Sequence, residues 1–187
     1  FDLETSSLEA IGAGFVICAV VKPLDGKPVI FRYDSYGCSP AKETKMIRAL
    51  VEELGGYDIL IAHNGERFDW NYVKTRALVL GIPITKRPIL YDTLKAFRRC
   101  GFLSRPNGFG KPSASLAMVV DLLGIQNIKT AIYPEEHWKT IWETDRSKRK
   151  TAIDNLVDHC VKDVVMTEEV FAVLFERDTN LSLRRTR

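Results

Sequence analysis

The first five residues, Phe1 to Thr5, constrain the chain most, because they alternate apolar and polar side chains. Successive side chains of an extended strand point to opposite faces, so Asp2 and Glu4 share one face while Phe1 and Leu3 share the other. Two carboxylates this close repel each other, and a divalent cation between them would remove the repulsion. The alternation therefore predicts a strand that forms one wall of a metal site.

Two later segments can bring further acids to the same place. The run from Ala62 to Asp69 follows a β-like segment and ends in an acid at a helix start, where a carboxylate suits the helix dipole. Near the end of the chain, His159 and Asp163 are four residues apart in a helical pattern and so lie on one helix face. Folded back onto the first strand, these segments would complete a set of four carboxylates and an imidazole: Asp2, Glu4, Asp69, Asp163 and His159.

In this order and spacing the motifs resemble the DEDD superfamily of 3′-to-5′ exonucleases, which have an RNase H-like fold. The resemblance runs from Asp2 to about Phe171, and its middle motif is Asn-x-x-x-Phe-Asp at residues 64–69. The subgroup that the chain resembles most is that of the proofreading domains of family B DNA polymerases and their stand-alone relatives. That subgroup has tyrosine where this chain has His159. A sister subgroup uses histidine five residues before the last aspartate, where this chain has Asp158.

The resemblance implies a metal-dependent 3′-to-5′ exonuclease that acts on single-stranded DNA or RNA, with DNA favoured, and releases nucleoside 5′-monophosphates. Two divalent ions, Mg²⁺ or Mn²⁺, would be held about 3.5 to 4 Å apart by the four acids. His159 would take a proton from the attacking water. We expect Thr5, Asn64 and Phe68 to contact the substrate, since Asn64 and Phe68 match family positions that line the substrate groove.

Two other functions stay open at this point. A structure-selective endonuclease is the first, because one fold supports both activities and the acids do not set polarity. A catalytically silent nucleic-acid-binding module is the second, and the intact acid set argues against it. Each acid also has a structural interpretation, with Asp69 as a helix cap, Asp163 as a solvated acid, and Asp2 and Glu4 as charges at a strand end.

A basic segment from Lys86 to Lys111 has seven Lys or Arg residues against a single acid, Asp92. Positive charge follows a phosphate backbone, and aromatic side chains stack on unpaired bases, so the segment predicts a cradle for a single strand. For any single residue, a solvated helix face or loop is the alternative. The residues expected to contact substrate are Arg98, Arg99, Arg105, Phe109 and Lys111. Asp92 is expected to cap the helix that follows it and stays outside the predicted metal set.

The periodicity of the chain predicts an α/β fold, a three-layer arrangement of a mixed sheet of about five strands with helices on both faces. The first strand, which carries Asp2 and Glu4, is expected at the centre. Strand, helix and strand in succession favour a parallel core, flanked by an antiparallel hairpin. Expected strands are 1–5, 15–21, 29–33, 59–62 and 89–91, and expected helices are about 46–54, 67–80, from 93 on, 113–123 and 151–177.

With 187 residues, 45% of them hydrophobic and 27% charged, the chain has the composition of a soluble globular domain. We expect one domain over residues 1–177 and a disordered basic tail over 178–187. The net charge of +3 does not by itself indicate nucleic-acid binding.

Four cysteines without a C-x-x-C pair indicate reduced thiols and an intracellular protein. The longest apolar run is too short for a membrane span. Because the chain begins without methionine, inside a predicted strand, it fits a fragment of a longer polypeptide.

Overall fold

A computed structural model of the chain describes residues 1–12, 14–37, 40–100, 105–106, 112–126, 128 and 145–177. The chain contains both strands and helices, as expected for an α/β protein. Their order is β1 (Asp2–Thr5), β2 (Val16–Val21), β3 (Val29–Arg32), α1 (Tyr33–Tyr36), α2 (Pro40–Leu54), β4 (Ile59–Ala62), α3 (Asp69–Val79), β5 (Ile89–Asp92), α4 (Thr93–Arg99), β6 (Arg105–Pro106), β7 (Pro112–Ser113), α5 (Leu116–Leu123) and α7 (Arg146–Phe175).

Five strands form the centre of the molecule, in two groups. β1, β2 and β3 make an antiparallel sheet in that order, and β4 and β5 pair in parallel. The nitrogen of Phe1 donates to the carbonyl of Ile61 in β4 at 2.7 Å, so the start of β1 lies between β2 and β4. The amide of Leu3, two residues further along the strand, donates to the Asp69 carboxylate and not to β4. The five strands thus have the expected mixture of antiparallel and parallel pairs, with β1 beside β4, although strand pairing joins β1 to β2 and not to β4.

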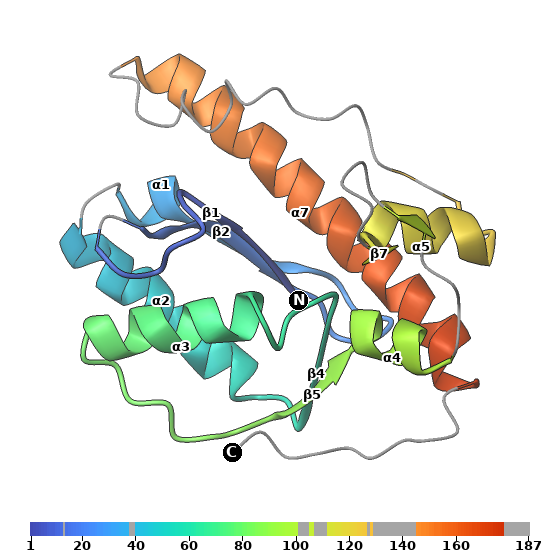
Figure 1. Cartoon of the computed structure of the whole chain (residues 1–187). Coiled ribbons are helices and arrows are strands. Elements are labelled where there is room, and N and C mark those ends of the chain that lie inside the picture. The colour runs from blue at the N-terminus through green and yellow to red at the C-terminus, as the bar shows by residue number, and fades with distance from the viewer. Residues whose placement is uncertain are drawn as a thin grey trace.

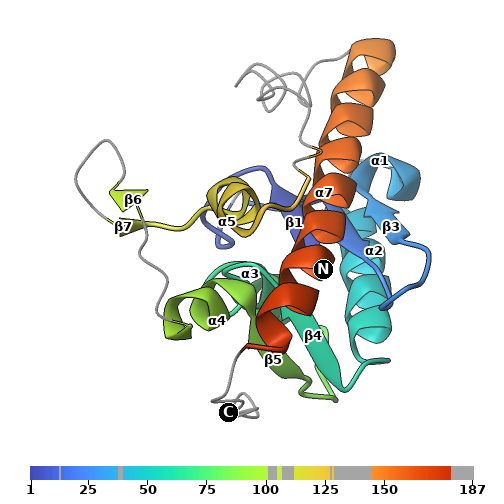
Figure 2. The same ribbon diagram turned by 90° about the vertical axis from the view of Figure 1, so that its right-hand side faces the viewer.

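Helices cover both faces of these strands, as the sequence predicts (Figure 1). On one face, Phe1 and Leu3 pack with buried side chains of α2 and α3. On the other face, Cys18 and Val20 of β2 pack against α7. Because both faces are covered, every residue of β2 is buried. A view turned by 90° shows α7 running across the strands, with α4 and α5 beside it (Figure 2).

Several element boundaries differ from the expected ones. The last helix begins at Arg146 rather than near residue 151, because the Asp145 carboxylate accepts the backbone N–H groups of Ser147 and Lys148 and caps it there. α2 begins at Pro40, six residues before its first predicted apolar position. The third strand ends at Arg32, where α1 follows. The short antiparallel pair β6–β7 was not expected, since its segment is rich in Gly and Pro. The predicted tail, 178–187, lies outside the described residues.

Candidate functional site

The contact between β1 and α7 brings three predicted site residues together. Leu3 points to the α2 and α3 core, which leaves Glu4 on the side of α7. There the Nε2 atom of His159 lies 3.7 Å from Glu4 Oε1 and 3.8 Å from Asp163 Oδ2. The Glu4 and Asp163 side chains are only 12% and 15% exposed. Asp163 is therefore largely buried against β1 rather than a solvated acid.

Cys160 fastens α7 to the same strand. Its Sγ atom donates to the backbone carbonyl of Asp2 at 3.3 Å. The thiol is buried, and burial is the first reason why the pKa of Cys160 stands well above its ordinary value. The buried thiol therefore links the helix to the strand.

Asp69 joins the site from a third element. It is the first residue of α3, is 4% exposed, and accepts the backbone N–H of Leu3 on Oδ1 at 3.2 Å. Burial raises its pKa from 3.8 to about 7, against the opposing effect of backbone hydrogen bonds. The cap position of α3 is Phe68, without a side-chain bond. Asp69 is therefore not the cap of α3, and its carboxylate links α3 to β1.

Asp2 lies where the negative charges of the site meet. Burial, and after it the charges of Asp69, Glu4 and Asp163, raises the pKa of Asp2 well above its ordinary value. All four predicted acids thus interact electrostatically, although they come from β1, α3 and α7. A cation would relieve both the repulsion and the cost of burying these charges.

The donor atoms of this cluster fit a hard divalent cation, since Mg²⁺ and Mn²⁺ favour carboxylate oxygens. Within the described part of the chain, no three His, Cys, Asp or Glu side chains are grouped so that they could hold a metal ion. The set therefore fits such an ion in charge and atom type, without forming a ready-made cage.

The turn that carries Asn64 and Phe68 lies beside Asp69. Asn64 has a backbone φ of 64°, and its carbonyl accepts the N–H groups of Arg67 and Phe68. A Cβ atom on Gly65 would lie 3.7 Å from Asp69 Oδ2 and only 2.4 Å from the Cβ of Ala62. Glycine is thus required at this position, and the turn abuts the buried carboxylate.

Other predicted substrate contacts are placed differently. Thr5 is buried, and its hydroxyl donates to the carbonyl of Ser7 at 2.9 Å, inside its own loop. Arg98 and Arg99 are exposed in the last turn of α4. The backbone of Arg105 belongs to β6, and its side chain, like Phe109 and Lys111, lies outside the described residues. The substrate contacts of these six residues stay predictions.

Two residues near the turn have structural roles. Asp92 accepts the N–H groups of Leu94 and Lys95 and so caps α4, as predicted. His63 is held by Thr93 Oγ1 at 3.0 Å and by the carbonyl of Ala114 at 2.8 Å. Sequence reasoning missed the further bonds of Asp92 to the turn at Asn64, because no local pattern marks a contact across 28 residues.

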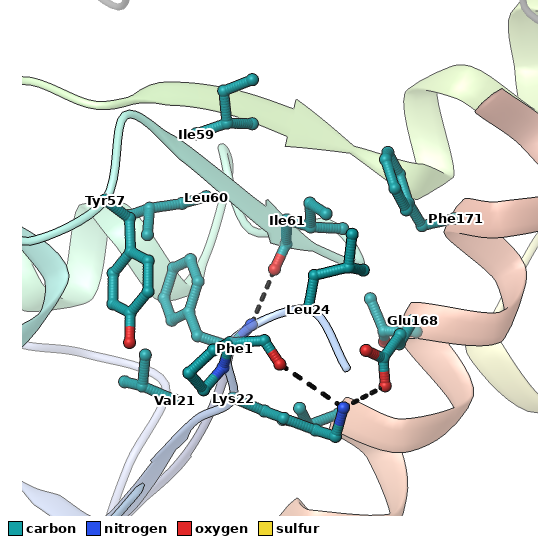
Figure 3. Close-up of a pocket in the computed structure, with 13 residues that line it drawn as sticks. Phe1, Val21, Lys22, Leu24, Tyr57, Ile59, Leu60, Ile61, Glu168 and Phe171 are labelled. Atoms are coloured by element: carbon teal, nitrogen blue, oxygen red, sulfur yellow. Dashed lines mark hydrogen bonds and ion pairs between the residues drawn. The ribbon is translucent and has the colours of Figure 1, made fainter. Parts of the chain in front are cut away.

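A separate apolar cavity of about 260 Å³ opens beside the start of β1 (Figure 3). It is lined mainly by apolar side chains, among them Phe1, Ile59 and Phe171, with the ion pair of Lys22 and Glu168 at one side. None of the four predicted acids lines it. The candidate site is therefore the acid cluster rather than this cavity.

The helices of the described residues include none that is both long enough and apolar enough to span a bilayer. This finding agrees with the short apolar runs of the sequence.

A family model described as the RNase H superfamily matches residues 1–175. A DNA polymerase of Methanocaldococcus jannaschii is 40% identical over 42 residues, which are 22% of this chain and 3% of that protein. The solved structure of the family B DNA polymerase from the hyperthermophilic archaeon Pyrobaculum calidifontis matches with a TM-score of 0.66 and 16% identity. That match covers 97% of this chain and 25% of the polymerase chain, and at this identity it shows the fold alone.

Proposed function

The chain belongs to the RNase H superfamily, and from this membership we propose that it is a metal-dependent 3′-to-5′ exonuclease acting on single-stranded ends. The predicted RNase H-like fold is confirmed by the same match. Membership indicates a hydrolytic nuclease. The direction of digestion, the DEDD assignment and the metals are the added content of the proposal.

The observation that carries the proposal is the acid cluster where β1, α3 and α7 meet. Its residues come from the three motifs of the DEDD pattern, and the structure brings their carboxylates within electrostatic reach of Asp2. A merely structural role for each acid does not explain why burial and mutual repulsion, both unfavourable, are concentrated at one point.

We assign the metals to Asp2, Glu4, Asp69 and Asp163. Two Mg²⁺ or Mn²⁺ ions held by these carboxylates would activate a water molecule and stabilise the leaving oxygen. Leu3 N–H and α3 hold Asp69 in place, and the bond from Cys160 to the Asp2 carbonyl holds α7 against β1. The chain thereby fixes its acids from both sides of the strand.

His159 is the proposed general base. Its Nε2 atom lies 3.7 Å from Glu4 and 3.8 Å from Asp163, so the imidazole stands at the rim of the acid cluster. A neutral imidazole can take a proton from an attacking water at physiological pH. In the subgroup that the chain resembles, a tyrosine has this position.

Single-stranded DNA is the proposed substrate, with the strand passing over the Asn64 turn and the basic end of α4. The polymerases that match the chain support DNA over RNA. Exposed Arg98 and Arg99 offer charge for the phosphate backbone. Because this chain spans a quarter of the matched polymerase structure, activity within a longer polypeptide is part of the proposal.

The test is digestion of a 5′-labelled single-stranded oligonucleotide with Mg²⁺ or Mn²⁺, beside the same oligonucleotide with a blocked 3′ end. The proposal predicts a ladder of shortening products from the free end and none from the blocked one. Immediate internal cuts in both substrates would favour the endonuclease instead. If the protein binds the oligonucleotide but shows no chelator-sensitive hydrolysis, it is a catalytically silent binding module.

A further inference from the structure

We propose that Asp92 is a positioning residue that holds the turn from Asn64 to Glu66 in place beside Asp69 and so shapes the substrate side of the site. The inference rests on the proposed function for its effect on substrate. Its structural part stands on hydrogen bonds within the chain.

The Asp92 carboxylate is 4% exposed and accepts four backbone N–H groups. Oδ1 accepts from Leu94 at 3.0 Å and from Lys95 at 3.3 Å, which is the ordinary cap of α4. Oδ1 also accepts from Asn64 at 3.0 Å, and Oδ2 accepts from Glu66 at 3.2 Å. A helix cap needs only the first two bonds, so the other two serve the turn.

The turn depends on such outside bonds. Asn64 is in the left-handed region, at a φ of 64°, where a residue with a side chain is strained unless its surroundings hold it. The N–H groups of Asn64 and Glu66 are part-buried, and the loss of an acceptor for such groups costs stability. Asp92 therefore offsets the cost of a conformation that brings Gly65 next to the Asp69 carboxylate.

Neighbouring contacts reinforce the same junction from either side. The Thr93 hydroxyl lies 3.3 Å from the carbonyl of Ala62 and 3.0 Å from His63 Nδ1. Lys95 and Glu66 form an ion pair, but both side chains are substantially exposed, so the pair adds little. The buried carboxylate of Asp92 is thus the main link between the β5–α4 junction and the turn.

Backbone donors occupy both oxygens of Asp92, so this residue acts on the substrate side of the site by holding the turn. Its charge is also a lesser cause, after burial, of the raised pKa of Asp69. Asp69, by contrast, is held separately by the N–H of Leu3 and by its place in α3. Loss of Asp92 is therefore expected to release Asn64 while Asp69 stays in position. Substrate binding should weaken more than turnover.

The test compares two serine variants. Asp92→Ser keeps a short cap for α4 but cannot reach the turn, whereas Asp145→Ser makes the same change at the α7 cap, whose carboxylate has cap bonds to Ser147 and Lys148. We expect Asp92→Ser to raise KM for a single-stranded oligonucleotide about tenfold with kcat changed less than about threefold. Asp145→Ser should leave both parameters unchanged.

Two further readouts make the inference decidable. Asp92→Asn keeps one acceptor oxygen and loses the bond to Glu66. Its KM should therefore lie between those of the parent and Asp92→Ser. Amide hydrogen exchange at Asn64 and Glu66 should be faster in Asp92→Ser than in the parent. Unchanged exchange would overturn the positioning role, and faster exchange with an unchanged KM would overturn its link to substrate. A parent protein without nuclease activity would contradict the proposed function instead, and exchange at the two amides would still decide the role of Asp92.

Discussion

Asp69 is buried in the acid cluster, where its charge, like those of Glu4 and Asp163, acts on Asp2. Its pKa of about 7 means that the folded, metal-free protein keeps a proton there over a range in which the unfolded chain has released it. A metal ion bound at the site would reverse this preference, because it favours the charged carboxylate.

The stability of the metal-free protein should therefore depend on pH. Between about pH 4 and pH 7 the folded state binds more protons than the unfolded state, so the unfolding free energy falls as the pH rises. Denaturant titrations in the presence of a chelator should show a decline of a few kcal/mol over this range. Asp69→Asn, which keeps an acceptor for Leu3 N–H and does not titrate, should show a flatter profile. The same slope in parent and variant would contradict the protonation of Asp69.

His159 is the proposed general base, at a position where the subgroup that the sequence resembles has tyrosine. Because His159 is proposed as a general base beside Glu4 and Asp163, its loss should lower turnover more than metal affinity. We expect His159→Ala to lower kcat by roughly 10²- to 10⁴-fold and His159→Tyr to recover part of that loss. Steady-state kinetics on a labelled oligonucleotide would measure both.

Asp158 supplies the matched control for His159. It is the exposed neighbour that pairs with Lys162, and Asp158→Ala should leave kcat near the parental value. A Mn²⁺ titration of His159→Ala separates two roles. If added Mn²⁺ restores the full rate, His159 helps to assemble the metal site and is not the base.

Among the elements, β1 and α7 were the most predictable. The alternation in β1 and the four-residue spacing in α7 are local patterns, so Asp2, Glu4, His159 and Asp163 could be assigned to common faces from the sequence. The start of α7 was not predictable in this way, since its first residues are basic and exposed and carry no apolar period. The cap at Asp145 determines that boundary.

Contacts between elements could not be predicted from the sequence. Leu3 N–H bonds to the side chain of Asp69 in α3, 66 residues away, and not to β4. The role of Asp92 likewise depends on a turn 26 to 28 residues away. Such bonds follow from the packing of the whole chain and leave no periodic signal.

The basic end of α4 and the strand β6 allow a test of the substrate path. Replacing Arg98, Arg99 and Arg105 together with glutamate should weaken the binding of single-stranded DNA. The slope of log K against log salt concentration should become smaller in magnitude by about two. Glutamate at Lys27, Lys45 and Arg48 changes the net charge equally at exposed positions of the β2–β3 turn and α2, and should have a smaller effect. Equal slopes for the two triple variants would show that Arg98, Arg99 and Arg105 do not follow the strand.

The whole molecule combines a superfamily fold with an acid cluster that no single element contains. The family match over residues 1–175 and the likeness to a polymerase structure show what the chain is similar to in fold. The meeting of β1, α3 and α7 explains why the three motifs, far apart in the sequence, can act together. Hydrolysis at this meeting point is the central claim.

The most direct test of this claim is to measure metal-dependent digestion by three proteins: the parent, Asp2→Ala and Asp163→Ala. Circular dichroism checks that each of them is folded. The parent should shorten a 5′-labelled single strand only when Mg²⁺ or Mn²⁺ is present. Both variants should remain folded and lose hydrolysis, because each removes one of the carboxylates proposed to hold the metals. If both folded variants digest the strand at the parental rate, the acid cluster is not the active site.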